Sequence, residues 1–389
     1  MNSYPDRLGC YRVGDLKFYS KLEAIEMHSR TGIHPHWDFN EAVFSSYDWS
    51  VEPEENLLEL YRQRAQQLRD KYDYIVLIYS GGADSETILQ SFLYNDIKLD
   101  EVASYVNYAA TGSKTSFMNE EIFGNAIPRI EKLKTNYPWL RHRIIEMRDL
   151  QIEHFQNEEI KYRWIYSINT FFDSNCVARE SLALKIRDWA DLIHQGKKVC
   201  LLWGFDKPRV FHENDRYFMR FIDILDSGPT VKSFAGELPY SDELFYWTPD
   251  LPQIVIKQGH MVKNYLEQNY SNSPFVSTVK TDLAYKKVNG VRHWLTKDGL
   301  HAIIYPNYQL ALTAAKPANT IVTERDIWFY SMEQSNYALK TWKMGVDKLW
   351  KILPDYWKNN PNDYMKGLKL CWSKDTHWML NSTARLSVY

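Results

Sequence analysis

Residues 74–85 read YIVLIYSGGADS, and the organisation of the chain follows from this stretch. Residues 74–79 are all apolar or aromatic and include β-branched types, which is typical of a strand buried on both faces of a parallel sheet. A Ser-Gly-Gly turn follows at residues 80–82, and a helical pattern begins at Asp84. The stretch therefore predicts a central strand, a tight glycine turn and a helix.

Such a turn makes a site for an anion, because free backbone N–H groups and the positive end of the helix dipole point at whatever lies over it. Gly81 and Gly82 allow positive φ angles and a close approach of the backbone to a phosphate. Ser80 and Ser85 offer hydroxyl donors. Asp84 would repel a bare anion, so its presence predicts a metal ion that accompanies the phosphates.

The segment SGGADS resembles the SGGxDS pyrophosphate-binding loop of the N-type ATP pyrophosphatases (the PP-loop family). This family includes the synthetase domain of asparagine synthetase, β-lactam synthetase, GMP synthetase and NAD synthetase. Its members cleave ATP between the α and β phosphates and adenylate a substrate, which a nucleophile then attacks. The motif is neither a Walker A loop nor a GxGxxG fingerprint. An ordinary glycine turn, whose Ser and Asp merely cap a helix, is the alternative.

Composition narrows the class of protein. The 389 residues are 44% hydrophobic and 25% charged, as in ordinary globular proteins. A net charge of −2 gives no support for a general nucleic-acid-binding surface, although it leaves room for a local basic patch. The four cysteines lie far apart and form no CxxC pair, which fits reduced thiols in a cytoplasm. No apolar run approaches the length of a membrane span, so we expect a cytoplasmic protein with no membrane partner.

Strands and helices are expected to alternate after the glycine turn, which predicts an α/β fold with a doubly wound parallel sheet. The expected further strands are 101–108, 141–147, 198–203, 216–223 (in a hairpin with the residues before it) and 242–247. The resemblance implies an adenine nucleotide alpha hydrolase-like, Rossmann-like domain with a helical C-terminal part. We expect an N-terminal segment at 1–70, the ATP pyrophosphatase domain at 71–260 and a substrate or assembly region at 261–389.

Outside the sheet, the patterns predict further elements. They are a strand at 16–19, helices at 21–29, 53–70, 84–94, 117–135 (with a possible break at Pro128), 150–195, 252–266 and 327–352, a loop over IHPHWDFN at 33–40, and a terminal strand in the tail LKLCWSKDTHWML.

The nucleotide base is expected over the carboxyl ends of the strands, where ligands lie in such sheets. Tyr79, Asn107 and Tyr108 are the candidates for reading the adenosine. Tyr108 either stacks on the adenine or packs at the sheet edge.

A second informative turn, GFDKPR at residues 204–209, follows the strand expected at 198–203. In position it is similar to the Gly-x-x-Asp turn of the asparagine synthetase group, whose acid helps to hold magnesium. The resemblance implies that Asp84 and Asp206 share one Mg²⁺. Lys207 and Arg209 would neutralise charge on the departing pyrophosphate, although they stand where the family has Asp-Glu. A solvated, proline-stiffened turn is the alternative.

A late lysine stabilises the transition state in the related synthetases, and Lys257 is the candidate here. An exposed lysine on an amphipathic helix is the alternative. The glutamine-dependent relatives carry a nucleophilic cysteine directly after the initiator Met, whereas this chain has Asn2. The amine would therefore come free or from a partner subunit.

The expected function is that of an ATP-dependent synthetase with ATP and Mg²⁺ bound. It would adenylate a carboxylate or carbonyl oxygen of a small molecule, release pyrophosphate and admit an amine. Two alternatives stay open: a PP-loop enzyme that modifies a nucleobase or nucleic acid, and a nucleotide-binding subunit without turnover. Sulfur transfer is disfavoured, because Cys176 and Cys200 are the only cysteines near the expected core.

Overall fold

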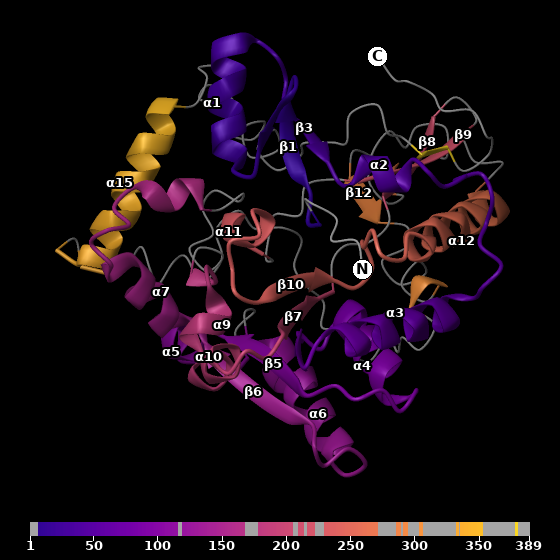
Figure 1. The fold of residues 1–389 in the computed structure, drawn as a ribbon, viewed down its shortest axis with the longest axis horizontal. Coiled ribbons are helices and arrows are strands. Elements are labelled where there is room, and N and C mark those ends of the chain that lie inside the picture. Colours follow the sequence, from indigo (N-terminus) through magenta and orange to yellow (C-terminus); the bar gives the residue numbers. More distant parts are fainter. Residues whose placement is uncertain are drawn as a thin grey trace.

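The structure is a computed structural model in which a central sheet is surrounded by helices (Figure 1). It describes residues 7–115, 119–167, 178–204, 209–213, 216–221, 229–270, 285–288, 291–294, 303–305, 332–333, 335–352 and 378–379.

Five parallel strands form the central sheet. They are β4 (Tyr74–Ile78), β5 (Glu101–Val106), β6 (Arg141–Glu146), β7 (Val199–Trp203) and β10 (Ser241–Leu244). Their order is β10-β7-β4-β5-β6, with every neighbouring pair parallel. The chain therefore runs outward from the centre through β5 and β6 and then crosses to the other side of β4. This order is compatible with a Rossmann-like fold, and it makes β4 and β7 the point where the strand order reverses.

The central strand is as deeply buried as its apolar sequence predicts. Ile75, Val76 and Leu77 have no exposed surface. Val76 pairs with Leu201 of β7 on one side and with Glu101 of β5 on the other. Neighbours on both edges satisfy the backbone of β4, and the turn that follows it leaves from the middle of the sheet.

Some of the helices around the sheet agree with the predicted ranges, and others are shorter, divided or additional. They are α3 (Leu57–Lys71), α4 (Ala83–Leu93), α5 (Tyr108–Thr111), the π-helix η1 (Ile122–Ala126), α6 (Ile127–Lys134), α7 (Met147–Gln156), the 3₁₀ helix η2 (Arg163–Tyr166), α9 (Leu182–Lys185), α10 (Arg187–His194), α11 (Val231–Phe234) and α12 (Gln253–Tyr270). Helices α3, α4 and α12 lie together on the right of Figure 1, where α3 packs against both of the others.

Smaller sheets flank this centre. Strands β1 (Cys10–Val13), β2 (Leu16–Phe18) and β3 (His36–Asp38) pair antiparallel beside helix α1 (Lys21–Thr31), and α2 (Glu41–Phe44) follows. Strands β8 (Arg209–Glu213), β9 (Arg216–Arg220) and β13 (Trp378–Met379) form a second sheet, and β11 (Tyr285–Val288) and β12 (Val291–Trp294) form a hairpin. The antiparallel pairing of β8 with β9 confirms the hairpin that was predicted for residues 216–223 and the residues before them.

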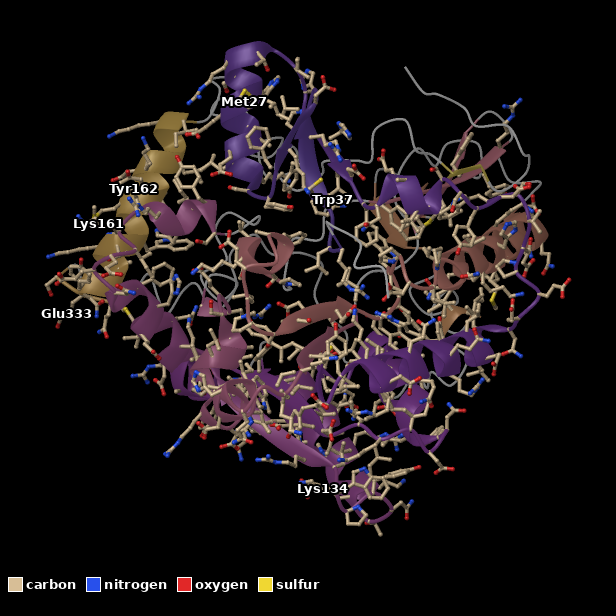
Figure 2. All side chains as sticks on the ribbon, viewed as in Figure 1. Met27, Trp37, Lys134, Lys161, Tyr162 and Glu333 are labelled. Atoms are coloured by element: carbon tan, nitrogen blue, oxygen red, sulfur yellow. The ribbon has the colours of Figure 1, made fainter. Side chains whose placement is uncertain are left out.

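One continuous core joins the N-terminal segment to the central sheet, extending from Leu8 to Tyr305. Trp37 (Figure 2) is fully buried. Its ring contacts Tyr11 at 4.9 Å and the edge of Phe234 at 5.7 Å between centroids. Large aromatic rings such as these bury much apolar surface in a core.

A second core forms where helix α15 (Tyr337–Ile352) packs on α7, η2 and α1. Trp164 and Trp342 stack there with ring centroids 4.1 Å apart. At its surface Tyr162 lies alongside α15, with the amine of Lys348 5.7 Å from the centre of its ring (Figure 2).

A buried ionic network fixes β10 to α3. Glu243 of β10 accepts hydrogen bonds from Arg7 at 2.7 Å, Arg64 at 3.0 Å and Lys71 at 2.9 Å. Arg64 also donates to Asp250 at 3.1 Å. Burial alone would raise the pKa of Glu243, but the charges of Arg64, Arg7 and Lys71 outweigh it and lower that pKa. Removing one partner would leave an uncompensated buried charge, so the network holds these elements in place.

Several predicted boundaries differ from the observed ones, each for a physical reason. The helix expected from Pro53 begins at Leu57, because the Asn56 side chain caps it by accepting from the Glu59 backbone N–H at 3.0 Å. The loop expected at 33–40 contains strand β3, which pairs with β1. The helix expected at 117–135 changes from the π-helical turn η1 to the α-helix α6 one residue before Pro128, which lies in the first turn of α6.

The long helices were also overextended. The segment expected to be helical at 150–195 is divided among α7, η2, α9 and α10. The aromatic helix expected at 327–352 begins at Tyr337 in the described part of the chain. Strand β5 ends at Val106, so that Tyr108 begins helix α5 instead of ending a strand.

Candidate functional site

The glycine turn lies at the carboxyl end of β4 and is braced by its two serines. The Ser80 backbone N–H donates to the Ser85 hydroxyl at 3.3 Å, and that hydroxyl donates to the Gly82 carbonyl at 3.2 Å. The Gly82 N–H donates to the Ser80 hydroxyl, also at 3.3 Å. Gly81 has φ +79°, a left-handed conformation that favours glycine. The predicted strand, turn and helix are therefore present, and the hydroxyls stabilise the turn.

Helix α4 begins directly after the turn without a side-chain cap. Gly82 is its N-cap residue and has no side chain that could bind the first-turn amides. The first N–H groups of a helix have no acceptor within the helix, and they carry the positive end of its dipole. The local structure thus has the properties of an anion site.

Asp84 lies in the first turn of α4, next to the end of β7. A Cβ placed on Gly204 would lie 3.4 Å from the Asp84 Cβ and 3.2 Å from Ile88, so glycine permits this close approach. Asp84 and Gly204, which follows β7, therefore meet at the reversal point of the sheet. This is the position at which open α/β sheets bind ligands.

Three buried tyrosines surround Asp84 on its inner side. The Tyr246 hydroxyl donates to the Asp84 backbone carbonyl at 2.7 Å. The ring of Tyr246 contacts those of Tyr61 and Tyr305, with centroids 5.5 and 5.7 Å away. Burial raises the pKa of all three hydroxyls, and the Asp84 charge adds to each shift. Tyr61 donates to the Ile304 carbonyl at 2.6 Å, which anchors the segment 303–305 beside the site.

Glu86 takes no part in the turn, although it lies close to it in sequence. Its buried carboxylate accepts from Arg129 at 2.7 Å, Tyr79 at 2.7 Å and Gln90 at 2.6 Å. The negative charge of Glu86 is therefore neutralised by Arg129. The Tyr79 hydroxyl is likewise engaged by Glu86.

A second helix covers the other side of the turn. Ala126 of η1 lies against Gly81, where an added Cβ would be 3.0 Å from the Ala126 backbone nitrogen. A Cβ on Gly82 would lie 3.0 Å from the Glu121 carboxylate oxygen Oε1 and 3.3 Å from the Ser80 hydroxyl. Gly81 is therefore required by its positive φ and by the nearby Ala126 backbone, whereas Gly82 leaves room for the Glu121 carboxylate.

The remaining adenosine candidates lie at the end of β5. Asn107 is buried, and its backbone N–H donates to Asn119 at 2.9 Å. Tyr108 is 42% exposed and contacts the edge of Phe123 at 5.9 Å between centroids. Both therefore follow a strand adjacent to β4, with the aromatic ring accessible.

The basic residues predicted at the site are Lys207, Arg209 and Lys257. The Lys257 ammonium forms an ion pair with Glu52 at 2.9 Å and donates to the Pro53 carbonyl at 2.8 Å, so α12 uses it to anchor the segment before α3. Arg209 begins strand β8. Asp206 and Lys207 lie outside the described residues.

Metal-binding side chains do not cluster in the described ranges. Within them, no three His, Cys, Asp or Glu side chains come together in a way that could hold a metal ion. In the same part of the chain, no helix is both long and apolar enough to cross a membrane.

Sequence reasoning missed Glu121 and the three tyrosines. Glu121 is 37 residues from Asp84 and belongs to no motif, and only the packing of η1 on the turn brings it there. Tyr61, Tyr246 and Tyr305 come from three distant segments. The apolar positions around Tyr61 and Tyr246 signal burial, but they do not identify which element each residue contacts.

Comparisons of the chain with protein-family models, with curated proteins and with solved structures find no significant match.

Proposed function

We propose that the protein is an ATP pyrophosphatase-type synthetase with an adenine nucleotide alpha hydrolase-like domain. It would adenylate a carboxylate or carbonyl oxygen, release pyrophosphate and pass the activated group to an amine. The observation that carries the proposal is the position of the SGGADS turn. It connects the central strand to an uncapped helix N-terminus at the reversal point of a Rossmann-like sheet.

The composition of the turn favours cleavage at the α phosphorus. A Walker A loop wraps the β phosphate and directs a lysine to the terminal phosphates, which suits γ-phosphoryl transfer. This turn contains no lysine: Ala83 follows the glycines, and Asp84 and Ser85 come next. A short glycine turn that leads into a helix N-terminus is suited to a leaving pyrophosphate. Ser85 would support it by keeping the turn in shape.

The two proposed carboxylate ligands are of the kind that a hard divalent cation prefers. Mg²⁺ prefers oxygen ligands, and it is usually held by one or two carboxylates together with substrate phosphates and water. Asp84 supplies one carboxylate at the edge of the turn, and Asp206 is the proposed second. When bound, the ion would screen the charge of the phosphates.

Other residues would bind and orient the substrates. Tyr108, with its exposed ring, and Asn107 are proposed to contact the adenosine at the end of β5. Lys207 and Arg209 are proposed to stabilise the departing pyrophosphate. Lys257 would reach the site only by leaving Glu52, so we assign it a lesser part.

Analysis of the nucleotide products tests the proposal. The purified protein is incubated with labelled ATP, Mg²⁺ and a small-molecule extract of cells, and the nucleotides are separated by chromatography. AMP and pyrophosphate are expected, together with an adenylated or amidated small molecule in the mass spectrum. ADP and inorganic phosphate as the main products would overturn the proposal. The Asp84→Asn variant is the control for contaminating ATPases.

A second candidate is a nucleotide-binding subunit without turnover. The observation in its favour is that Lys257, which was expected to act in the transition state, forms an ion pair with Glu52 instead. Binding of ATP without any AMP formation, in the presence of the same extract, would support this candidate. The nucleobase-modifying alternative predicts instead that a nucleic-acid fraction stimulates AMP release.

A further inference from the structure

A carboxylate already lies beside the glycine turn. The Oε1 atom of Glu121 is 3.0 Å from the position that a Gly82 Cβ would occupy, on the same side as the Ser80 hydroxyl. Gly82 is the N-cap residue of α4, an 11-residue helix without a side-chain cap. A negative group at this place is favoured by the helix dipole, as a bound anion would be.

The packing of η1 holds Glu121 in this position. Glu121 is the residue before the π-helical turn, and Ala126 at the other end of that turn lies against Gly81. π-Helical turns are rare and occur often at functional sites. Glu121 and Ala126 thus lie beside the two adjacent glycines at the two ends of one π-helical turn, whose packing brings the carboxylate to the glycine turn.

The Glu121 charge also acts on the hydroxyl of Tyr79, the residue that follows β4. Burial is the main cause that raises the pKa of the Tyr79 hydroxyl, followed by the charge of Glu86, and Glu121 adds a smaller contribution. Asp84 lies on the opposite side of the turn, towards β7. The turn is therefore flanked by a carboxylate on each side.

We propose that Glu121 makes the glycine turn selective for metal-bound pyrophosphate over the metal-free anion. The inference rests on the proposed function. Asp84 explains why a cation accompanies the phosphates, but it acts on the β7 side of the turn. Glu121 adds a negative charge on the β5 side that would oppose an anion without its cation. Like charges at short range in a partly buried site repel strongly. A cation that neutralises the phosphates removes this penalty, so Glu121 would act as a determinant of specificity.

Calorimetric titration with inorganic pyrophosphate tests this role. Wild type, Glu121→Gln, Glu121→Ala and Glu121→Asp are titrated with pyrophosphate in excess Mg²⁺ and again in EDTA. Glu120→Gln is the matched control, because Glu120 is the adjacent, exposed carboxylate and the charge change is the same. Thermal unfolding of each variant shows that it is folded.

Wild type is expected to bind pyrophosphate at least tenfold more tightly with Mg²⁺ than without. Glu121→Gln and Glu121→Ala should bind the metal-free anion at least tenfold more tightly than wild type, with a change of threefold or less for the metal-bound form. Glu121→Asp and Glu120→Gln should behave like wild type.

Two results contradict the inference in different ways. If wild type binds metal-bound pyrophosphate and the two neutral variants gain nothing towards the metal-free anion, Glu121 has no such role and the proposed function stands. Loss of affinity for both forms of pyrophosphate in both neutral variants would likewise contradict the role of Glu121 and leave the proposed function standing. If no form of the protein binds pyrophosphate under either condition, both the inference and the proposed function are overturned.

Discussion

Replacing Asp242 by Asn removes a buried titratable group beside the last residue of β7. Its carboxylate accepts from the Trp203 indole N–H at 2.6 Å and from the Ser233 hydroxyl at 2.5 Å, which connects β7 and β10 to α11. Burial is the main cause that raises the pKa of Asp242 from its ordinary 3.8 to about 6. The two hydrogen bonds oppose this shift without cancelling it.

The direction of the pH dependence follows from this difference. The folded state holds the Asp242 proton more tightly than the unfolded state, so the stabilisation is complete below pH 3.8 and is lost as the pH rises through about 6. One pH unit corresponds to ~1.4 kcal/mol, so the total loss is about 3 kcal/mol. About half of it falls above pH 5, by the same relation.

Urea unfolding followed by circular dichroism measures this effect. An asparagine can keep both hydrogen bonds, because its oxygen accepts from Trp203 and its amide can donate to the Ser233 hydroxyl. Asp242→Asn should therefore gain about 1 to 2 kcal/mol relative to wild type between pH 5 and pH 8. The exposed Asp191→Asn is the control. A stability difference between variant and wild type that does not change over this range would refute the reasoning.

Three other substitutions give distinct results. A Cβ on Gly345 would overlap the Trp164 ring, so Gly345→Ala should cost about 1–3 kcal/mol in urea unfolding, whereas Gly124→Ala, with open space around it, should cost less than half as much. Tyr246→Phe removes the hydroxyl that donates to the Asp84 carbonyl. It should cost about 1 kcal/mol and raise the Mg²⁺ concentration for half-maximal ATP turnover, and an unchanged Mg²⁺ requirement would limit Tyr246 to a structural role. Asp84→Asn should abolish most Mg²⁺-dependent ATP binding without changing the melting temperature, and equal turnover at limiting Mg²⁺ would remove Asp84 from the site.

The sequence identifies the centre of the fold because one local pattern determines it. A continuous apolar run from Tyr74 and a glycine turn can only be a buried strand that leads into a helix, and the structure has both. The alternation of strands and helices likewise predicts the parallel sheet. The start of α3 had a local signal as well, since Asn56 lies three residues before Glu59 and is a good N-cap residue.

The other parts of the site depend on contacts between distant segments. Strand β3 is only three residues long, and pairing with β1 makes it a strand. Glu121 and Tyr246 come to the turn through the packing of η1 and of the chain after β10. Neither has a neighbouring residue pattern that indicates a ligand. Lys257 was expected at the site from the resemblance, but the ion pair with Glu52 is a contact across more than 200 residues that no local pattern predicts.

Hydrogen–deuterium exchange over residues 79–89 tests the central claim most directly. Mass spectrometry compares exchange in this segment for the protein alone, with Mg²⁺ and with Mg²⁺ and pyrophosphate. If the glycine turn and the first turn of α4 hold pyrophosphate, their amides gain acceptors and exchange in this segment should slow in the last condition alone. Unchanged exchange there at saturating ligand, with protection in another segment, would contradict the account.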